Sequence, residues 1–273
     1  MYCPTFRNRR RISLLVTGIA LCVVAMIAWI QSGRLAHVSF FTGSTLLAVI
    51  VLLVLLGVRR RLPVLPLGSV SSWTQVHLYA GIFSAGVYGM HVPSLVAGGV
   101  FECGLSIVFL IVTASGFYGI YASRTLPKRL TAVEGQHRFD RVAWHRGQIA
   151  DKARELLDEL NEQSGIRVLG SFYTNFLNPF FSTRPPLAYV LVPTGVRRRR
   201  LLSGLKELNR YLESEGRRTA GRFAALVRRR DDLDYQFALQ LRLRLWLVIH
   251  CVFSVVLIVG GFIHAVMVWR FVG

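Results

Sequence analysis

Four histidines form two equally spaced pairs within apolar stretches of the chain. His77 and His91 are fourteen residues apart, and so are His250 and His264. Fourteen residues of α-helix rise about 21 Å and turn about 40° short of four whole turns, so each pair lies on nearly one face of its helix. Neutral imidazole is a standard ligand of metal ions and of haem iron. The spacing therefore predicts two ligand positions on each of two helices.

Two such helices side by side would hold two haems, each ligated by one imidazole from either helix. A single histidine on an apolar helix is more often a hydrogen-bonded core residue than a ligand. Here, however, the four histidines within the expected spans all belong to the two pairs, and ionisable residues inside spans are rare and commonly functional. No C-x-x-C-H attachment motif is present. We therefore predict two haem b groups bound without covalent attachment.

The composition indicates an integral membrane protein, because 53% of the residues are hydrophobic. Five segments approach the twenty or so apolar residues that cross a hydrocarbon core. They are expected at 12–30, 40–58, 73–94, 103–122 and 245–269. The first segment has a cationic lead but a long core and no convincing cleavage site, so an uncleaved helix is expected. Pro127 is expected to end the fourth helix.

The distribution of basic residues predicts the orientation of the spans. With the N-terminus on the cytoplasmic side, that side holds 31 of the 33 basic residues, and only Arg34 and Arg270 lie outside. The basic residues of the short loops alone predict the same orientation. The predicted location is the bacterial inner membrane, with the C-terminus outside. The third and fifth spans then run in the same direction, which pairs His77 with His250 near the cytoplasmic side and His91 with His264 near the outer side.

Arginines near the span ends could bind the haem propionates, because guanidinium matches a carboxylate in a two-point fork. Arg124, Arg242 and Arg244 are the candidates at the inner haem, and Arg34, His37 and Arg270 are those at the outer haem. The plain alternative is that these cations only anchor the helix ends at the membrane surface. The predicted cofactor-binding residues are the four histidines with Arg124 and Arg244.

Glycines cluster between the histidines of each pair. Either they leave room for a flat macrocycle or they allow close helix packing, which is a common use of small residues in membranes. The sequence leaves both interpretations open for Gly81, Gly86, Gly89, Gly260 and Gly261.

A large insert separates the fourth and fifth spans. The expected domain organisation is 1–122 for four helices, 123–244 for a cytoplasmic insert and 245–273 for the last helix. The insert carries 24 basic and 13 acidic residues. Helical spacing predicts helices over 147–164 and 201–213, and a last helix from about Thr219 that runs into the fifth span. Short apolar runs predict strands at 166–172 and 187–192, so a small α+β module is expected.

The basic insert favours membrane lipid or an acidic electron-transfer protein as a partner. No recognition motif accompanies the charge, so a nucleic-acid partner is not expected. His137 and His145 also lie in the insert, where a solvent-facing or hydrogen-bonded role is expected of them.

The two H-x13-H pairs on the third and fifth spans resemble the transmembrane domain of ferric reductases and NADPH oxidases. They are more loosely similar to cytochrome b of quinol-oxidising bc complexes. The run 116–131 followed by the insert also resembles bacterial cytochrome b-like membrane proteins. The resemblance implies an all-α haem bundle and a role as part of a quinol oxidoreductase or metal reductase.

The chain departs from the reductase families because it contains no G-x-G-x-x-G fingerprint and no P-loop. A redox partner protein, a larger respiratory complex or a membrane quinone would then have to exchange electrons with the two haems. The competing hypothesis is a non-redox membrane anchor or assembly subunit, whose insert binds lipid or a soluble partner.

Overall fold

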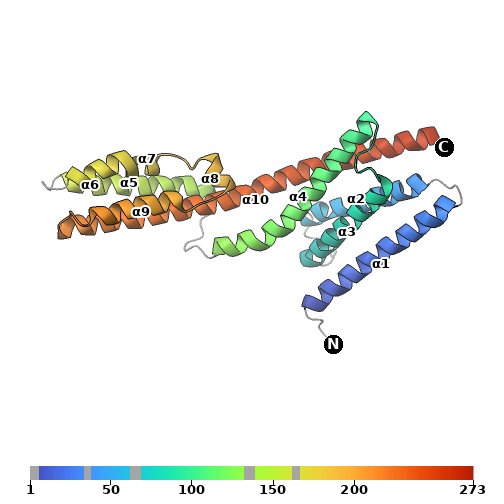
Figure 1. Ribbon diagram of the computed structural model, residues 1–273, viewed down its shortest axis with the longest axis horizontal. Coiled ribbons are helices and arrows are strands. Elements are labelled where there is room, and N and C mark those ends of the chain that lie inside the picture. The colour runs from blue at the N-terminus through green and yellow to red at the C-terminus, as the bar shows by residue number, and fades with distance from the viewer. Residues whose placement is uncertain (1–5, 34–37, 62–68, 132–138, 162–166, 273) are drawn as a thin grey trace. The chain divides into compact units, whose positions relative to one another are not determined.

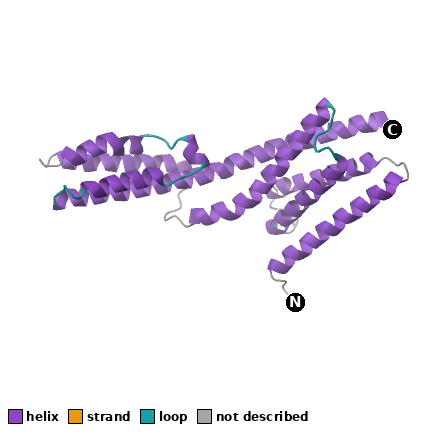
Figure 2. Cartoon of the chain, in the orientation of Figure 1, coloured by secondary structure: helices purple, strands orange, loops and turns teal. Residues whose placement is uncertain are grey.

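The computed structural model describes residues 6–33, 38–61, 69–131, 139–161 and 167–272. Every regular element in these ranges is helical (Figures 1 and 2). The chain divides into two compact units, one of residues 1–121 with 247–273 and one of residues 122–246. The domain boundaries expected from hydropathy, at 122/123 and 244/245, lie close to the boundaries between these two units.

The first unit contains α1 (Phe6–Gly33), α2 (Val38–Arg61), α3 (Val70–His91), most of α4 (Val100–Thr131) and the last part of α10 (Ser214–Val272). Its core joins residues from all five helices, with Val87 fully buried and Tyr88 stacked on Phe109 at 4.1 Å between ring centroids. The Tyr88 hydroxyl donates to the carbonyl of Leu95 at 2.6 Å. This contact ties the loop after α3 to the core.

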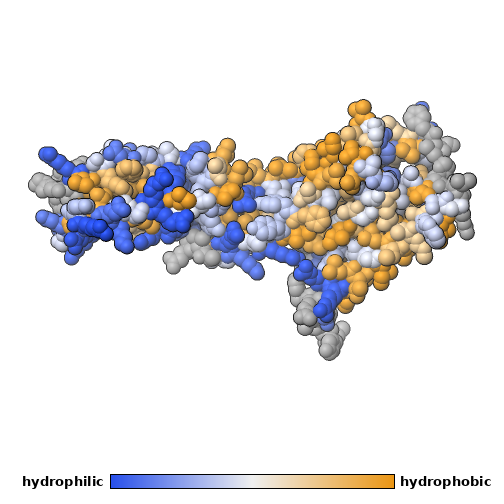
Figure 3. Space-filling model, viewed as in Figure 1, coloured by the Kyte–Doolittle hydropathy of each residue, from blue (hydrophilic) through white to orange (hydrophobic). Residues whose placement is uncertain are grey.

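Four helices are long and apolar enough to cross a membrane: α1, α2, α4 and α10. Their outward faces expose many large aliphatic side chains, and Figure 3 shows these as a broad apolar surface over the first unit. Such a surface suits hydrocarbon rather than water. Four of the five expected spans therefore lie on helices of suitable length and hydropathy.

The third expected span, 73–94, coincides with α3 but does not reach the hydropathy of the other four. Its sequence VSSWTQVHLYAGIFSAGVYGMH carries hydroxyls, an amide and two histidines among its apolar residues. The helix begins at a Ser69 cap, whose hydroxyl accepts from the amide of Ser72 at 3.1 Å. It packs against α1 and α2. Ser84 is buried, whereas Ser71, Ser72 and Thr74 near its start are exposed.

The second unit contains α5 (Val142–Asn161), α6 (Arg167–Phe172), α7 (Asn178–Ser182), α8 (Leu187–Leu191), α9 (Val196–Leu208) and the first part of α10. A π-helical turn at Tyr173–Leu177 joins α6 to α7. Leu169, Tyr173, Leu177 and Phe181 are each buried in one core with residues of α5, α9 and α10. Their spacing of four residues is helical.

This periodicity corrects the expectation of an α+β insert. The segments expected as strands, 166–172 and 187–192, are helical from Arg167 and over Leu187–Leu191, and the described part of the insert contains no strand. Periodicity over a short apolar run does not separate a strand from a buried helix. The helical repeat becomes visible only when the window extends to Phe181.

The helices expected over 147–164 and 201–213 are present as α5 and α9 with shifted ends. The expected continuous helix into the last span is confirmed, because α10 runs unbroken for 59 residues. The expected stop at Pro127 is wrong, since α4 continues through it to Thr131. Proline removes one amide donor, and here the helix tolerates that loss near its C-terminal end.

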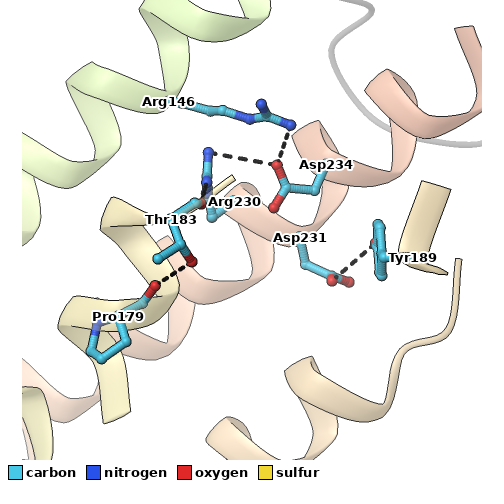
Figure 4. Close-up of polar contacts among 7 residues, drawn as sticks. All are labelled: Arg146, Pro179, Thr183, Tyr189, Arg230, Asp231 and Asp234. Atoms are coloured by element: carbon cyan, nitrogen blue, oxygen red, sulfur yellow. Dashed lines mark hydrogen bonds and ion pairs between the residues drawn. The ribbon is translucent and has the colours of Figure 1, made fainter. Parts of the chain in front are cut away.

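A buried cluster of charges ties α10 to its neighbours in the second unit (Figure 4). Arg230 is 1% exposed, donates to the Thr183 carbonyl at 2.7 Å and lies 3.5 Å from Asp234. Arg146 of α5 approaches the same carboxylate at 2.6 Å, and the Tyr189 hydroxyl donates to Asp231 at 3.3 Å. Residues 230–234 therefore hold α5, the end of α7 and α8 at one level of α10.

Burial raises the pKa of Asp234 above its ordinary value and lowers that of Arg230 to about 10. Desolvation is the largest cause for both, and it outweighs the attraction between the two groups. Buried ion pairs often contribute little net stability for this reason, but losing one member is costly. The cluster therefore fixes the alignment of the helices more than it adds to their stability.

Arg230→Ala should lower the free energy of opening of the second unit by about 3 kcal/mol, because it leaves a cavity, an unpaired Thr183 carbonyl and a carboxylate with one partner fewer. Hydrogen exchange of the α5 and α9 amides in the full-length protein measures this change. Arg229→Ala, at the exposed neighbouring residue, is the matched control and should change it by less than about 0.5 kcal/mol. Equal effects of the two substitutions would contradict the role of the cluster.

Candidate functional site

The structure brings the four histidines into two facing pairs within the first unit. The ring centroids of His77 on α3 and His250 on α10 are 6.3 Å apart, and those of His91 and His264 are 6.5 Å apart. The ring planes are steeply inclined, at 69° and 77°. Each imidazole thus lies beside the partner that the sequence assigned to it, and α3 and α10 run in the same direction along this contact.

The separation of the rings fits two imidazoles that share one metal ion. A metal–nitrogen bond of about 2 Å and a further ~1.1 Å from nitrogen to ring centroid place two opposed ring centroids about 6.2 Å apart. Both observed separations lie within about 0.3 Å of this value. Rings in direct van der Waals contact through their faces would lie closer together.

The Nδ1 atoms of the two α3 histidines meet acceptors on α2. His77 Nδ1 lies 3.0 Å from the carbonyl oxygen of Leu53 and, since a carbonyl only accepts, Nδ1 must carry the proton. His91 Nδ1 lies 3.1 Å from the hydroxyl oxygen of Thr42. That hydroxyl already donates its proton to the carbonyls of Val38 and Ser39, so it accepts from His91.

The Nδ1 atoms of the two α10 histidines meet acceptors on α4. His250 Nδ1 lies 2.7 Å from the Ser115 hydroxyl, which donates its own proton to the Val112 carbonyl. Ser115 therefore accepts from His250. His264 Nδ1 lies 3.9 Å from a carboxylate oxygen of Glu102, which is beyond hydrogen-bond distance.

These contacts select one tautomer for His77, His91 and His250. With the proton on Nδ1, the lone pair that binds a metal is on Nε2. Histidines that bind metals through one ring nitrogen almost always donate the other to a protein acceptor, which fixes the ring and raises its basicity. With Nδ1 protonated, His77, His91 and His250 present Nε2 as the ring nitrogen that is able to bind a metal.

Glycines on the supporting helices let the imidazoles approach closely. A Cβ atom at Gly43 on α2 would lie 2.9 Å from Cε1 of His91, and one at Gly116 on α4 would lie 3.9 Å from Cε1 of His250. The first distance is too short for ordinary contact. Gly43 is therefore required where the His91 ring lies against α2.

The glycines between the histidines divide into two groups. A Cβ atom at Gly86, Gly260 or Gly261 would meet a leucine of a neighbouring helix within 2.6 to 3.5 Å, so these three serve helix packing. A Cβ atom at Gly81 or Gly89 would meet nothing within 4 Å. The space beside these two is compatible with a macrocycle.

The predicted propionate partners that the structure describes are divided between the two units. Arg124 and Arg244 are exposed residues of the second unit, and the Arg244 guanidinium lies 4.0 Å above the ring of Phe139. Arg270 is exposed in the first unit, whereas Arg34 and His37 lie outside the described residues. Propionate binding by Arg124 and Arg244 stays a prediction.

Sequence reasoning missed the residues of α2 and α4 that face the imidazoles: Leu53, Thr42, Ser115 and Glu102. A signal was present for Glu102, which is the only acidic residue of the chain before Glu134. The two hydroxyls gave a weaker signal because serine and threonine in apolar helices commonly bond to their own backbone. Only the packing of α2 and α4 against the histidines shows this role.

No group of three or more His, Cys, Asp or Glu side chains gathers within the described ranges in the manner of a protein-only metal site. Each candidate site instead offers two opposed imidazoles. The chain matches no protein-family model, no curated protein and no solved structure. The fold and the site together define a helical protein with four helices able to cross a membrane and two facing histidine pairs inside the first unit.

Gly43→Ala should disturb the His91–His264 pair and leave the His77–His250 pair intact, because the added methyl group would displace the His91 ring. Gly57→Ala is the matched control on the same helix, since a Cβ atom there meets nothing within 4 Å. Magnetic resonance spectra of the histidine rings in the purified protein should show one altered pair for the first variant and none for the second. Altered spectra of both pairs in Gly43→Ala would contradict a local clash.

Proposed function

We propose that the protein carries electrons across a membrane through two haem b groups. His77 and His250 ligate the inner haem, and His91 and His264 ligate the outer one. The spacing of the facing rings, 6.3 and 6.5 Å between centroids, is the observation that carries the proposal. The protonated Nδ1 atoms of three of the histidines support it, because they leave the metal-binding lone pair on Nε2.

Haem iron supplies reversible one-electron chemistry, and the polypeptide determines where that chemistry takes place. The four imidazoles bind the two groups about 21 Å apart along α3 and α10, as fourteen residues of helix require. Leu53, Thr42 and Ser115 hold the imidazoles in one tautomer. The apolar core around Val87 and Phe109 keeps bulk water from the interior.

The proposal includes α3 as a fifth span. A helix of 22 residues is long enough to cross the hydrocarbon core. Its hydroxyls and histidines suit a central helix that contacts protein, and α1 and α2 pack against it. Polar residues within a bilayer usually face the interior of a helix bundle, where other protein groups rather than lipid contact them. With the N-terminus in the cytoplasm, four spans before the insert place the insert in the cytoplasm. The third and fifth spans, α3 and α10, then run in the same direction.

The proposed location is a bacterial inner membrane, with the N-terminus and the insert in the cytoplasm. The haems would exchange electrons with a membrane quinone, a redox protein or a larger respiratory complex. In this arrangement the protein is a subunit of a quinol oxidoreductase or metal reductase. Arg124 and Arg244 would then bind the inner propionates near the start of the insert.

The first experiment is a reduced-minus-oxidised optical spectrum of the detergent-purified protein, with the extracted haem quantified per chain. Two low-spin haem b groups per chain would support the electron-transfer function. Absence of haem from protein expressed with ample haem supply would overturn it, and would favour a membrane anchor or assembly subunit instead.

Substitution of single histidines should separate the two haems. His77→Leu or His250→Leu should remove the inner haem, and His91→Leu or His264→Leu should remove the outer one, each lowering the content from about two to about one per chain by loss of an axial ligand. The measurements are haem content and redox titration. His145→Leu, on α5 outside both pairs, should retain both haems. Equal loss of all haem from every substitution would refute two separable sites.

Cysteine labelling tests the orientation and the fifth span. In a background without native cysteines, Ser94→Cys in the loop after α3 should react with an impermeant reagent in intact cells. Ser203→Cys in the insert should react only in inverted vesicles. If α3 does not cross the membrane and the N-terminus stays inside, residue 94 lies in the cytoplasm and the insert lies outside, so the two labelling results are reversed. That result would contradict the five-span arrangement.

A further inference from the structure

Glu102 is the only carboxylate in the part of the chain that holds the histidines. No other acidic residue occurs in 1–121 or 247–273. It lies in the first turn of α4, where the helix dipole favours negative charge. Its Oε1 atom is 3.9 Å from Nδ1 of His264. The position of this single acidic side chain beside His264 indicates a role at that histidine.

The His264 ring needs an acceptor that the described structure does not otherwise provide. Its Nδ1 atom is buried and has no hydrogen-bond partner within the described ranges. The corresponding atoms of the other three imidazoles all meet neutral oxygens at 2.7 to 3.1 Å. A buried ring nitrogen without a partner is costly. Rotation of the flexible Glu102 side chain would bring its carboxylate within hydrogen-bond distance.

Neighbouring contacts keep the two groups facing one another. Phe101 stacks on His264 with 6.4 Å between ring centroids and 24° between ring planes. The His264 side chain is 26% exposed and that of Glu102 is 39% exposed. The charge is therefore shielded from water in part, which strengthens its effect on the imidazole.

We infer that Glu102 is a positioning residue that accepts the Nδ1 proton of His264 and lowers the reduction potential of the outer haem. This inference rests on the proposed function. A carboxylate acceptor makes an imidazole a more basic ligand than a neutral hydroxyl or carbonyl does. A more electron-rich ligand and a nearby negative charge both stabilise oxidised iron relative to reduced iron. At the inner haem, the Nδ1 atoms of His77 and His250 lie beside the neutral oxygens of Leu53 and Ser115 instead.

The test is a redox titration of the full-length protein, with the optical and electron paramagnetic resonance signals of the two haems followed separately. Glu102→Gln keeps the shape and an acceptor oxygen but removes the charge. It should shift the outer midpoint potential to a more positive value and leave the inner one unchanged. Glu102→Asp, which keeps the charge on a shorter side chain, should give a smaller shift. Ser115→Ala is the matched control and should alter the inner haem alone.

The outcomes separate this inference from the function on which it rests. Unchanged outer potential in Glu102→Gln, with both haems retained, would overturn the role of Glu102 and leave the dihaem function standing. An equal shift of both potentials would also overturn it, because a local hydrogen bond acts on one haem only. Wild-type protein without haem would overturn both.

Discussion

The packing of α2 and α4 against the four histidines is the constraint on which the candidate site depends. Hydrogen bonds link His77, His91 and His250 to these two helices, and Glu102 lies 3.9 Å from the fourth imidazole. The ring of a histidine on an apolar helix rotates unless its second nitrogen is held. In this protein α2 holds both histidines of α3 through Leu53 and Thr42, and α4 faces both histidines of α10 with Ser115 and Glu102. At both levels α3 and α10 carry the rings, and residues of α2 and α4 pack against them.

The contacts of α2 and α4 with the histidines account for several residues of the first unit that hydropathy alone does not explain. The α3 helix has a lower hydropathy than the four helices able to cross a membrane, and it packs against α1 and α2. Gly43 has no side chain because the His91 ring occupies that space. The hydroxyls of Thr42 and Ser115 each bond to a carbonyl of their own helix and lie 3.1 and 2.7 Å from a histidine ring nitrogen. Each choice of residue follows from the same requirement for close, oriented imidazoles.

The helices of the second unit are aligned by a hydrophobic core and by a buried cluster of charged residues. Its core is built from side chains repeated every four residues along 169–181, packed on α5, α9 and α10. Desolvation lowers the pKa of Arg230 and raises that of Asp234, so burial disfavours the charged forms of both groups. They do restrict which residues of α5 and α10 can lie side by side, since a shifted alignment would bury unpaired charges. The continuous helix α10 belongs to both units and contributes to both kinds of packing.

The sequence by itself determined the histidine pairs, four helices apolar enough to cross a membrane and the continuous last helix, because these depend on periodicity and hydropathy along one segment. It did not determine the helical state of 167–172 and 187–191, whose short apolar runs fit a strand as well as a buried helix. It also could not assign Thr42, Ser115 and Glu102 to particular imidazoles. Those contacts join residues 49, 135 and 162 positions apart, and only the packing of whole helices decides which side chains meet.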